Sequence, residues 1–135
     1  MSRSTSISGN YLLDTNIVIA FFANELRIVQ AVNQVGQASV PSIVLGELYF
    51  GALHSGRVVA NLARVEALIQ HTAIVPCDAD TAKHYGRIKH ALQVRGRPLP
   101  ENDIWIAAIA MQHGLTLISR DRHFEEIAGL QRERW

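Results

Sequence analysis

The chain has 135 residues, which predicts one domain with room for a real hydrophobic core. A hydrophobic content of 48% and a charged content of 19% are typical of a globular protein and exclude an intrinsically disordered chain. The formal net charge of +1 identifies no partner, but arginine supplies eleven of the thirteen Lys and Arg side chains. This bias is a weak indication of phosphate ligands, although a GC-rich genome would also produce it.

The single cysteine and the N-terminal segment bear on location. Because Cys77 is alone, the chain has no internal disulfide and no cysteine-based zinc site, and a cytoplasmic location is the default expectation. Residues 1–10 are Ser-rich, lack the apolar core of a signal peptide, and are expected to form a flexible tail. The longest wholly apolar run, 17–23, is too short to span a bilayer, so we expect no membrane role.

The first half of the chain predicts two strands and four helices. Residues 11–13 form a short apolar run typical of a buried strand, and helical stretches follow from about residue 16 and over 25–35. Residues 38–41 predict a second strand. A strongly apolar helix then runs over 42–54, and 57–70 carries apolar residues at helical spacing.

The second half continues the alternation. Residues 73–76 predict a third strand, Asp78 is placed to cap a helix over 79–94, and Pro100 suits the start of a helix that ends near residue 113. Residues 115–118 predict a fourth strand, followed by a short helix over 124–127 and an edge strand within 130–135. The pattern indicates an α/β fold with one domain over 11–135, a central parallel sheet of four to five strands flanked by helices.

Four acidic residues occupy positions where a fold rarely places an acid. Asp14 and Asp121 follow predicted strands, whose carboxyl ends are where parallel sheets bind ligands. Glu47 and Asp103 lie in apolar helical stretches. Ionised carboxylates in such settings need a positive compensator, and for several converging acids the simplest one is a hard divalent cation.

Each acid also has a simpler structural interpretation. Asp14 would cap the following helix, Asp103 would favour the first turn of its helix, and Asp121 would be a turn residue. Glu47 has the weakest such explanation, because the positions one turn away along its helix are apolar. Taken singly these interpretations are sound, but they do not explain why two acids at strand ends coincide with two acids in apolar helices.

Two further features suggest contacts with other molecules. Basic residues recur between Lys83 and Arg97, and the ordinary explanation is a solvated helix face, with a phosphate-backbone contact as the second. The candidate contacts are Arg87, Arg95, Arg97 and Arg120. The helix at 17–23 is apolar on every side, so it is either wholly buried, which is the default expectation, or partly covered by a partner.

Four motifs, in this order, resemble those of PIN domains, and most closely those of VapC-type toxins of bacterial toxin–antitoxin pairs. They are Leu-Asp-Thr-Asn at 13–16, Gly-Glu-Leu-Tyr-Phe-Gly at 46–51, Asn-Asp-x-x-Ile-Ala-Ala at 102–108 and Leu-Thr-Leu-Ile-Ser-Arg-Asp-x-x-Phe at 115–124. The resemblance covers nearly the whole chain from Tyr11 onward. Each motif is weak alone, and the order of all four is specific.

The resemblance implies a PIN-like domain that acts as a metal-dependent endoribonuclease, usually a homodimer, held inactive by a VapB-type antitoxin that provides any contact with DNA. It implies Mg²⁺ or Mn²⁺ as the cofactor, and it makes the basic residues above candidate RNA contacts. The catalytic and metal-binding residues would be Asp14, Glu47, Asp103 and Asp121, and the supporting polar residues would be Thr15, Asn16, Asn102 and Ser119.

One position departs from the pattern. The fourth acid varies in the family and is sometimes Asn, whereas here it is Asp121, followed by Arg122 and His123 where some members carry further acids. The family context also suggests that an antitoxin segment would lie in an apolar groove beside the helix at 17–23.

Two other α/β classes with acids at strand ends lack their required residues in this chain. A phosphoacceptor receiver domain would need a lysine at a strand end, where neither Lys83 nor Lys89 lies, and a haloacid-dehalogenase-like phosphatase would need an acid at Asn16. Two alternatives stay open on the sequence: a subunit of a DNA-bound toxin–antitoxin regulatory complex with little nuclease activity, and an RNA-processing PIN nuclease without an antitoxin.

Overall fold

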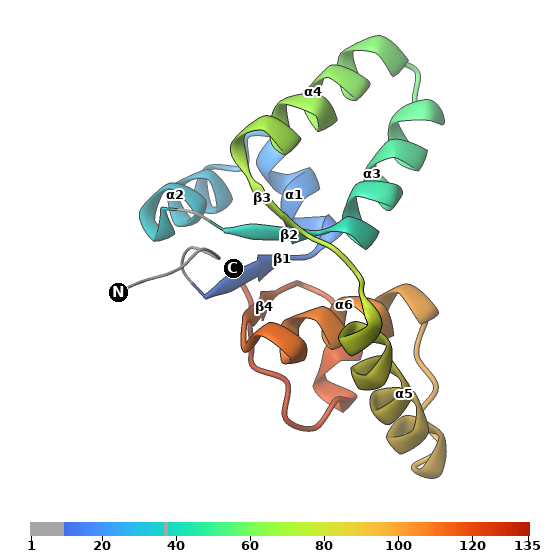
Figure 1. Cartoon of the computed structure of the whole chain (residues 1–135). Coiled ribbons are helices and arrows are strands. Elements are labelled where there is room, and N and C mark those ends of the chain that lie inside the picture. The colour runs from blue at the N-terminus through green and yellow to red at the C-terminus, as the bar shows by residue number, and fades with distance from the viewer. Residues whose placement is uncertain (1–9, 37) are drawn as a thin grey trace.

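Five short strands form one parallel sheet in the computed structural model, which describes residues 10–36 and 38–135 (Figure 1). The strand order is β3-β2-β1-β4-β5, and all four pairings are parallel. The bounds are Tyr11–Leu13 for β1, Ser39–Pro41 for β2, Ala73–Val75 for β3, Thr116–Ile118 for β4 and Arg132–Glu133 for β5. The predicted α/β class and the central parallel sheet are confirmed.

Six α-helices and one short 3₁₀ helix surround the sheet in the described residues. They are α1 Thr15–Phe22, α2 Leu26–Val35, α3 Ser42–Leu53, α4 Val58–His71, α5 Ala79–Val94, α6 Glu101–His113 and the 3₁₀ helix η1 Arg122–Glu126. Figure 1 shows α3 and α4 together on one side of the sheet and α5 and α6 packed against each other on the other side. Each predicted element lies within a few residues of its observed position.

Most of the predicted N-terminal tail, residues 1–9, lies outside the described residues. Asn10 is described and is exposed, and its carbonyl accepts a 2.5 Å hydrogen bond from the N–H of Thr116. The chain is therefore tied to β4 one residue before β1 begins.

The pairing of β1 with β4 brings two distant strand ends together. Leu12 and Leu117 are opposite each other and fully buried, as expected for central strands of a sheet that is covered on both faces. Leu13 lies opposite Ile118, and the N–H of Asp14 donates to the carbonyl of Ile118 at 3.0 Å. The residues that follow the two strands therefore leave the sheet side by side.

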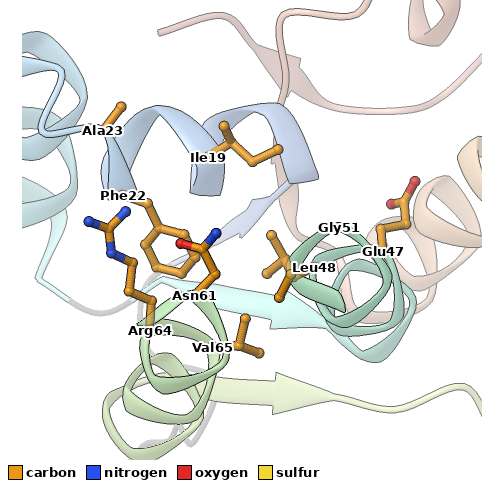
Figure 2. Close-up of a pocket in the computed structure, with 10 residues that line it drawn as sticks. Ile19, Phe22, Ala23, Glu47, Leu48, Gly51, Asn61, Arg64 and Val65 are labelled. Atoms are coloured by element: carbon orange, nitrogen blue, oxygen red, sulfur yellow. The ribbon is translucent and has the colours of Figure 1, made fainter. Parts of the chain in front are cut away.

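An apolar groove of about 310 Å³ lies between α1, α3 and α4 (Figure 2). Ile19 and Phe22 of α1 line one side of it, Leu48 of α3 lines another, and Val65 of α4 closes it. Glu47 lies at the rim of the same groove. We call this hollow the α1–α3–α4 groove.

The default expectation that the helix at 17–23 is wholly buried is wrong, because Ile19 and Ala23 are exposed and Phe21 and Phe22 are half-buried. Ile17, Val18 and Ala20 are buried, but Ile19 is 54% exposed because it faces the α1–α3–α4 groove rather than the sheet. A helical wheel that is apolar on every side cannot tell which face meets the core.

No single helix of the described residues is long and apolar enough to cross a membrane. α1 and α2 reach the required length only together, and a bend of 110° separates them.

Alanine substitutions at two glycines should change the free energy of unfolding in opposite directions. Gly114 ends α6 in the left-handed conformation at φ 65°, so Gly114→Ala should lower the free energy of unfolding by about 1 kcal/mol through backbone strain alone. Gly86 lies within α5, so Gly86→Ala should raise it by roughly 0.5–1 kcal/mol. A Cβ at either position meets no atom within 4 Å, which makes the pair a matched comparison. Urea unfolding measures both, and effects of the same sign would contradict the backbone argument.

Candidate metal centre

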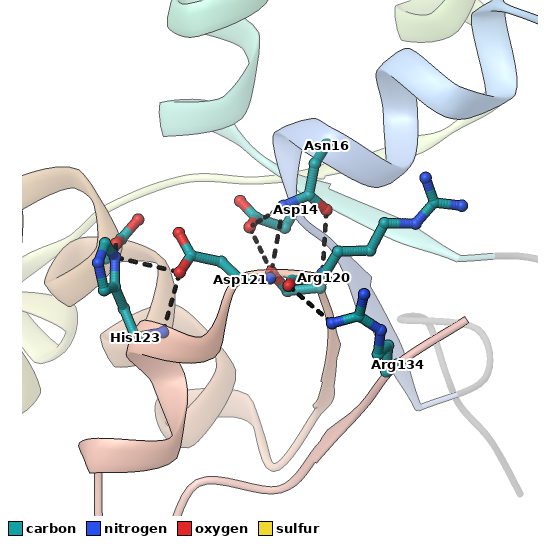
Figure 3. Close-up of polar contacts among 8 residues, drawn as sticks. Asp14, Asn16, Arg120, Asp121, His123 and Arg134 are labelled. Carbon is teal, nitrogen blue, oxygen red and sulfur yellow. Dashed lines mark hydrogen bonds and ion pairs between the residues drawn. The ribbon is translucent and has the colours of Figure 1, made fainter.

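Asp14 is the most enclosed of the predicted acids, with 5% of its surface exposed at the junction of β1 and α1. One carboxylate oxygen, Oδ1, accepts a hydrogen bond from the N–H of Thr15 at 2.8 Å, so the residue does cap α1. The other, Oδ2, accepts from the hydroxyl of Ser119 at 2.6 Å and from the amide of Asn16 at 3.3 Å (Figure 3). The capping and site interpretations of Asp14 are thus compatible.

Asn16 and Ser119 tie the loop after β4 to the start of α1. The amide of Asn16 also lies 3.4 Å from the Ser119 hydroxyl, and its carbonyl oxygen accepts from the N–H of Arg120 at 3.2 Å. The Ser119 hydroxyl in turn accepts from the N–H of Asp121 at 2.9 Å. Both residues therefore contact Asp14, and Ser119 also binds the backbone of Asp121, while their supporting role in catalysis stays a prediction.

Glu47 joins the site from α3 through Thr15, whose hydroxyl donates to the Glu47 carboxylate at 2.5 Å. Its surroundings differ from what the helical wheel suggested. Val44, one turn before Glu47, is fully buried, but Phe50, nearly one turn after it, is 63% exposed, so the apolar face around Glu47 is covered at one end and open at the other. The half-buried Glu47 stands between the metal centre and the α1–α3–α4 groove.

Asp103, Asp121 and His123 form a second cluster directly beside Asp14. The ring atom Nδ1 of His123 lies 3.0 Å from Oδ2 of Asp103 and 3.1 Å from Oδ1 of Asp121 (Figure 3). One ligand atom from each of the three residues falls within 4.8 Å of the others, a spacing that can hold one metal ion. His123 was not among the predicted site residues, and its position two residues after Asp121 was the only signal for it.

The acids influence one another electrostatically. Burial raises the pKa of Asp14, the bonds from Ser119 and Thr15 oppose it, and the charges of Asp103 and Glu47 raise it further. Burial also raises the pKa of Asp103, with the charges of Asp121 and Glu47 adding and the hydrogen bond to His123 opposing. Residues from four separate segments therefore converge into one negatively charged site, and a cation would relieve their repulsion.

His123 already partly compensates that charge. The hydrogen bond to Asp103 and the charge of Asp121 raise the pKa of its imidazole. Protonation of Nδ1 of His123 and binding of a metal ion by that atom exclude each other, since a ligating nitrogen must be deprotonated.

Asn102 and Arg87 make no hydrogen bond or ion pair with the four acids in the described residues. Asn102 is exposed at the start of α6 and lines an open hollow between α3 and α6 together with Glu47. Arg87 is exposed on α5, on a shallow hollow whose other residues include Ile88 and Met111. Their roles stay predictions.

The other candidate RNA contacts are engaged in ion pairs. The guanidinium of Arg95 donates to the side-chain carboxylate of Glu126 at 3.0 Å and to the backbone carbonyl of Glu126 at 2.5 Å. Nε of Arg97 lies 3.8 Å from the same carboxylate. The guanidinium of Arg120 donates two hydrogen bonds to Glu25. A ligand would have to displace or share these carboxylates, so the RNA contacts also stay predictions.

The donor set fits a divalent cation. Oxygen atoms of several carboxylates are the ligands that Mg²⁺ and Mn²⁺ prefer, and an imidazole nitrogen is available from His123. Ser119 and Asn16 donate hydrogen bonds to Asp14, and Thr15 donates one to Glu47. Residues that orient metal ligands usually make such bonds.

The chain is similar to known proteins over most of its length. The PIN domain family model matches residues 11–130. Ribonuclease VapC2 of Haemophilus influenzae is 40% identical over 128 residues, which cover 93% of this chain and 97% of that protein. The tRNA(fMet)-specific endonuclease VapC of Shigella flexneri is 35% identical over 129 residues, with the same coverage. Among solved structures, DNA-bound VapBC of Salmonella typhimurium matches with a TM-score of 0.89 at 33% identity, covering 94% of this chain and 98% of that chain.

The raised pKa of Asp14 predicts a pH-dependent effect of Asp14→Asn on metal-free protein. Because the carboxyl binds its proton more tightly folded than unfolded, its ionisation destabilises the fold at neutral pH. That penalty disappears as the pH falls below the unfolded value of about 3.9. With chelator present, Asp14→Asn should therefore raise the melting temperature near neutral pH by roughly 3–5 °C, the shift that about 1 kcal/mol causes in a domain of this size. In acid the variant and the wild type should melt at the same temperature.

The exposed acid Asp80 provides the control, because Asp80→Asn removes a carboxylate without relieving burial. Thermal unfolding followed by circular dichroism over a pH series distinguishes the two. A gain for Asp14→Asn that is independent of pH, or equal to that of Asp80→Asn, would contradict the electrostatic explanation.

Proposed function

Since this chain belongs to the PIN-domain family and, within it, to the VapC ribonucleases, we propose that it is a metal-dependent endoribonuclease, the toxin of a toxin–antitoxin pair. The observation that carries the proposal is the convergence of acids from β1, α3, α6 and the loop after β4 at one edge of the sheet. The proposed metal ligands and catalytic residues are Asp14, Glu47, Asp103 and Asp121, with Thr15, Asn16, Asn102 and Ser119 in support.

Asp14 and Asp103 would have distinct positions in the hydrolysis of RNA. A bound divalent cation lowers the pKa of water and neutralises charge that builds up during in-line displacement at phosphorus. Asp14, fixed by Ser119 and Thr15, presents its carboxylate at the end of the sheet, and Asp103 presents its own from α6. Because both acids are held by their neighbours before the substrate arrives, little reorganisation is needed when RNA binds.

His123 supports a choice between the two proposed ions. Mg²⁺ takes oxygen ligands almost exclusively, whereas transition-metal ions bind imidazole nitrogen more readily. With Nδ1 of His123 between Asp103 and Asp121, the donor set favours Mn²⁺ over Mg²⁺.

The α1–α3–α4 groove supports a protein partner. Ile19, Phe50 and Leu53 are each more than half exposed on the helices that border it, and an apolar helical segment of a VapB-type antitoxin would cover such a surface. The DNA-bound VapBC of Salmonella typhimurium pairs a protein of this family with such a partner. We propose that DNA is reached only through the antitoxin, that the toxin is a homodimer, and that the complex is cytoplasmic.

The two alternatives from the sequence are less well supported. A purely regulatory subunit would have no use for four converging acids, because burial and the neighbouring acids raise the pKa of Asp14 and of Asp103, and both carboxylates destabilise the fold without a cation. A processing nuclease without an antitoxin would have no partner for the exposed apolar residues of the groove.

Asp103→Asn tests the nuclease. Loss of one metal-binding carboxylate should lower the rate of RNA cleavage by more than about 100-fold. Mutating a residue that only orients a metal ligand already lowers metal affinity or activity by about 10–100-fold. The measurement is cleavage of labelled RNA with Mn²⁺, with chelator, and with Asp80→Asn as the control acid, followed by sequencing of the RNA ends after induced expression. Wild-type cleavage by Asp103→Asn, or cleavage that survives chelation, would refute the assignment.

Ile19→Glu tests the partner surface. A charge placed in the α1–α3–α4 groove should weaken capture of the co-expressed antitoxin by about tenfold or more, because an apolar contact is replaced by a desolvated carboxylate. Val59→Glu is the matched control, since Val59 is 84% exposed on α4 and does not line the groove. Equal binding of the antitoxin by Ile19→Glu and wild type would show that the partner lies elsewhere.

A further inference from the structure

Two Arg-acid-Arg triplets border the metal centre. Residues 120–122 run from the loop after β4 to the first residue of η1, and residues 132–134 include strand β5. β5 pairs in parallel with β4, with Glu133 opposite Ile118, so the two triplets lie beside each other at the same edge of the sheet. Arg132 lies in β5 and Arg134 follows the end of the strand, and both line the same hollow.

The triplets line a pocket of about 240 Å³, which we call the arginine pocket. Its walls comprise Arg120, Arg122, Arg132 and Arg134, together with Asp121 and Glu125. The volume is below the roughly 300–1,000 Å³ of typical small-molecule sites, so the pocket suits one group of a longer chain better than a free metabolite.

Two of the guanidinium groups are free to bind an anion. Arg120 is paired with Glu25, and Arg132 lies 3.6 Å from Glu125. Arg122 and Arg134, by contrast, have no carboxylate partner among residues 10–36 and 38–135.

Arg134 is nevertheless held in place. Its guanidinium donates to the backbone carbonyl of Arg120 at 3.0 Å (Figure 3). This bond uses one N–H of the five that the group carries and leaves the rest for a ligand.

The arginine pocket is continuous with the metal centre. Asp121 lines the pocket and contacts His123, and Ser119 lines it while donating to Asp14. A polyanion that approaches the four carboxylates is repelled by them, and the adjacent arginines supply positive charge where a neighbouring part of that polyanion would lie. Arg122 and Arg134 are exposed, so a long chain can pass over them.

We propose that the arginine pocket binds a backbone phosphate of the RNA next to the phosphate that is cut, and thereby sets which linkage enters the metal centre. The proposal rests on the ribonuclease function proposed above. Phosphate is the favoured anion because the planar guanidinium fork matches its oxygens in pairs. The arginines then position the substrate by charge, and they carry no base specificity.

The test compares Arg122→Gln/Arg134→Gln with Arg57→Gln/Arg27→Gln in binding a labelled single-stranded RNA, measured by fluorescence anisotropy in chelator to prevent cleavage. Arg27 is exposed on α2 and Arg57 is exposed immediately before α4, and neither lines the pocket, so the control removes the same charge. The pocket variant should bind about tenfold or more weakly than the control. Its salt dependence should also flatten by about 0.7 in log–log slope, the value for one lost phosphate contact on a single strand.

A second measurement locates the phosphate. Wild-type protein should lose affinity when one linkage near the cut carries a neutral methylphosphonate, and the pocket variant should be insensitive to the same change. Arg122→Lys/Arg134→Lys keeps the charge without the fork and should recover part of the affinity. Melting temperatures of all variants identify any loss of fold.

Each other outcome overturns the proposal. If the pocket variant binds RNA as tightly as the control, or stays sensitive at every linkage, the pocket holds no RNA phosphate. If RNA binding is unchanged while capture of the antitoxin weakens, the pocket is a protein-binding surface. Absence of metal-dependent RNA cleavage by the wild type would instead refute the ribonuclease function itself, so the two failures are distinguishable.

Discussion

The hydrogen bond from Ser119 to Asp14 is the interaction on which the site depends. It joins residues 105 positions apart, and it exists because β1 and β4 are neighbours in the sheet and end at the same level. The bond holds a buried carboxylate toward the residues that follow β4, and the Ser119 hydroxyl then accepts from the backbone of Asp121. A carboxylate placed this deeply is costly when ionised, so the fold accepts a local instability at the point where function requires charge.

Positive charge is arranged around this acidic centre in a graded way. Nearest is the imidazole of His123, between Asp103 and Asp121. The adjacent arginine pocket holds the guanidinium groups of Arg122 and Arg134, and it also holds Arg120, which is neutralised by Glu25. A substrate with regularly spaced phosphates matches such an order, because one phosphate can meet the acids through a cation while the next meets arginine directly.

Sequence reasoning was strongest where a local pattern determines the outcome. The short apolar runs and the helix ends, such as Gly114 after α6, follow from residue preferences within a few positions, and the PIN-domain resemblance was confirmed. The strand order was not predictable, because nothing local indicates that β1 lies between β2 and β4. Contacts between elements that are distant in the sequence were therefore missed, such as that of His123 with Asp103. The exposure of Ile19 was missed as well.

Glu47 belongs to two surfaces at once. It receives the hydroxyl of Thr15 beside the metal centre, and it lies at the rim of the α1–α3–α4 groove. Any occupant of the groove that contacts Glu47 changes the carboxylate available to the cation, and a bound cation changes the rim that the occupant meets. The two binding free energies are then coupled, and by thermodynamic reciprocity each ligand alters the affinity of the other by the same factor. Inhibition by a partner would in that case require no movement of the backbone, only competition for one side chain.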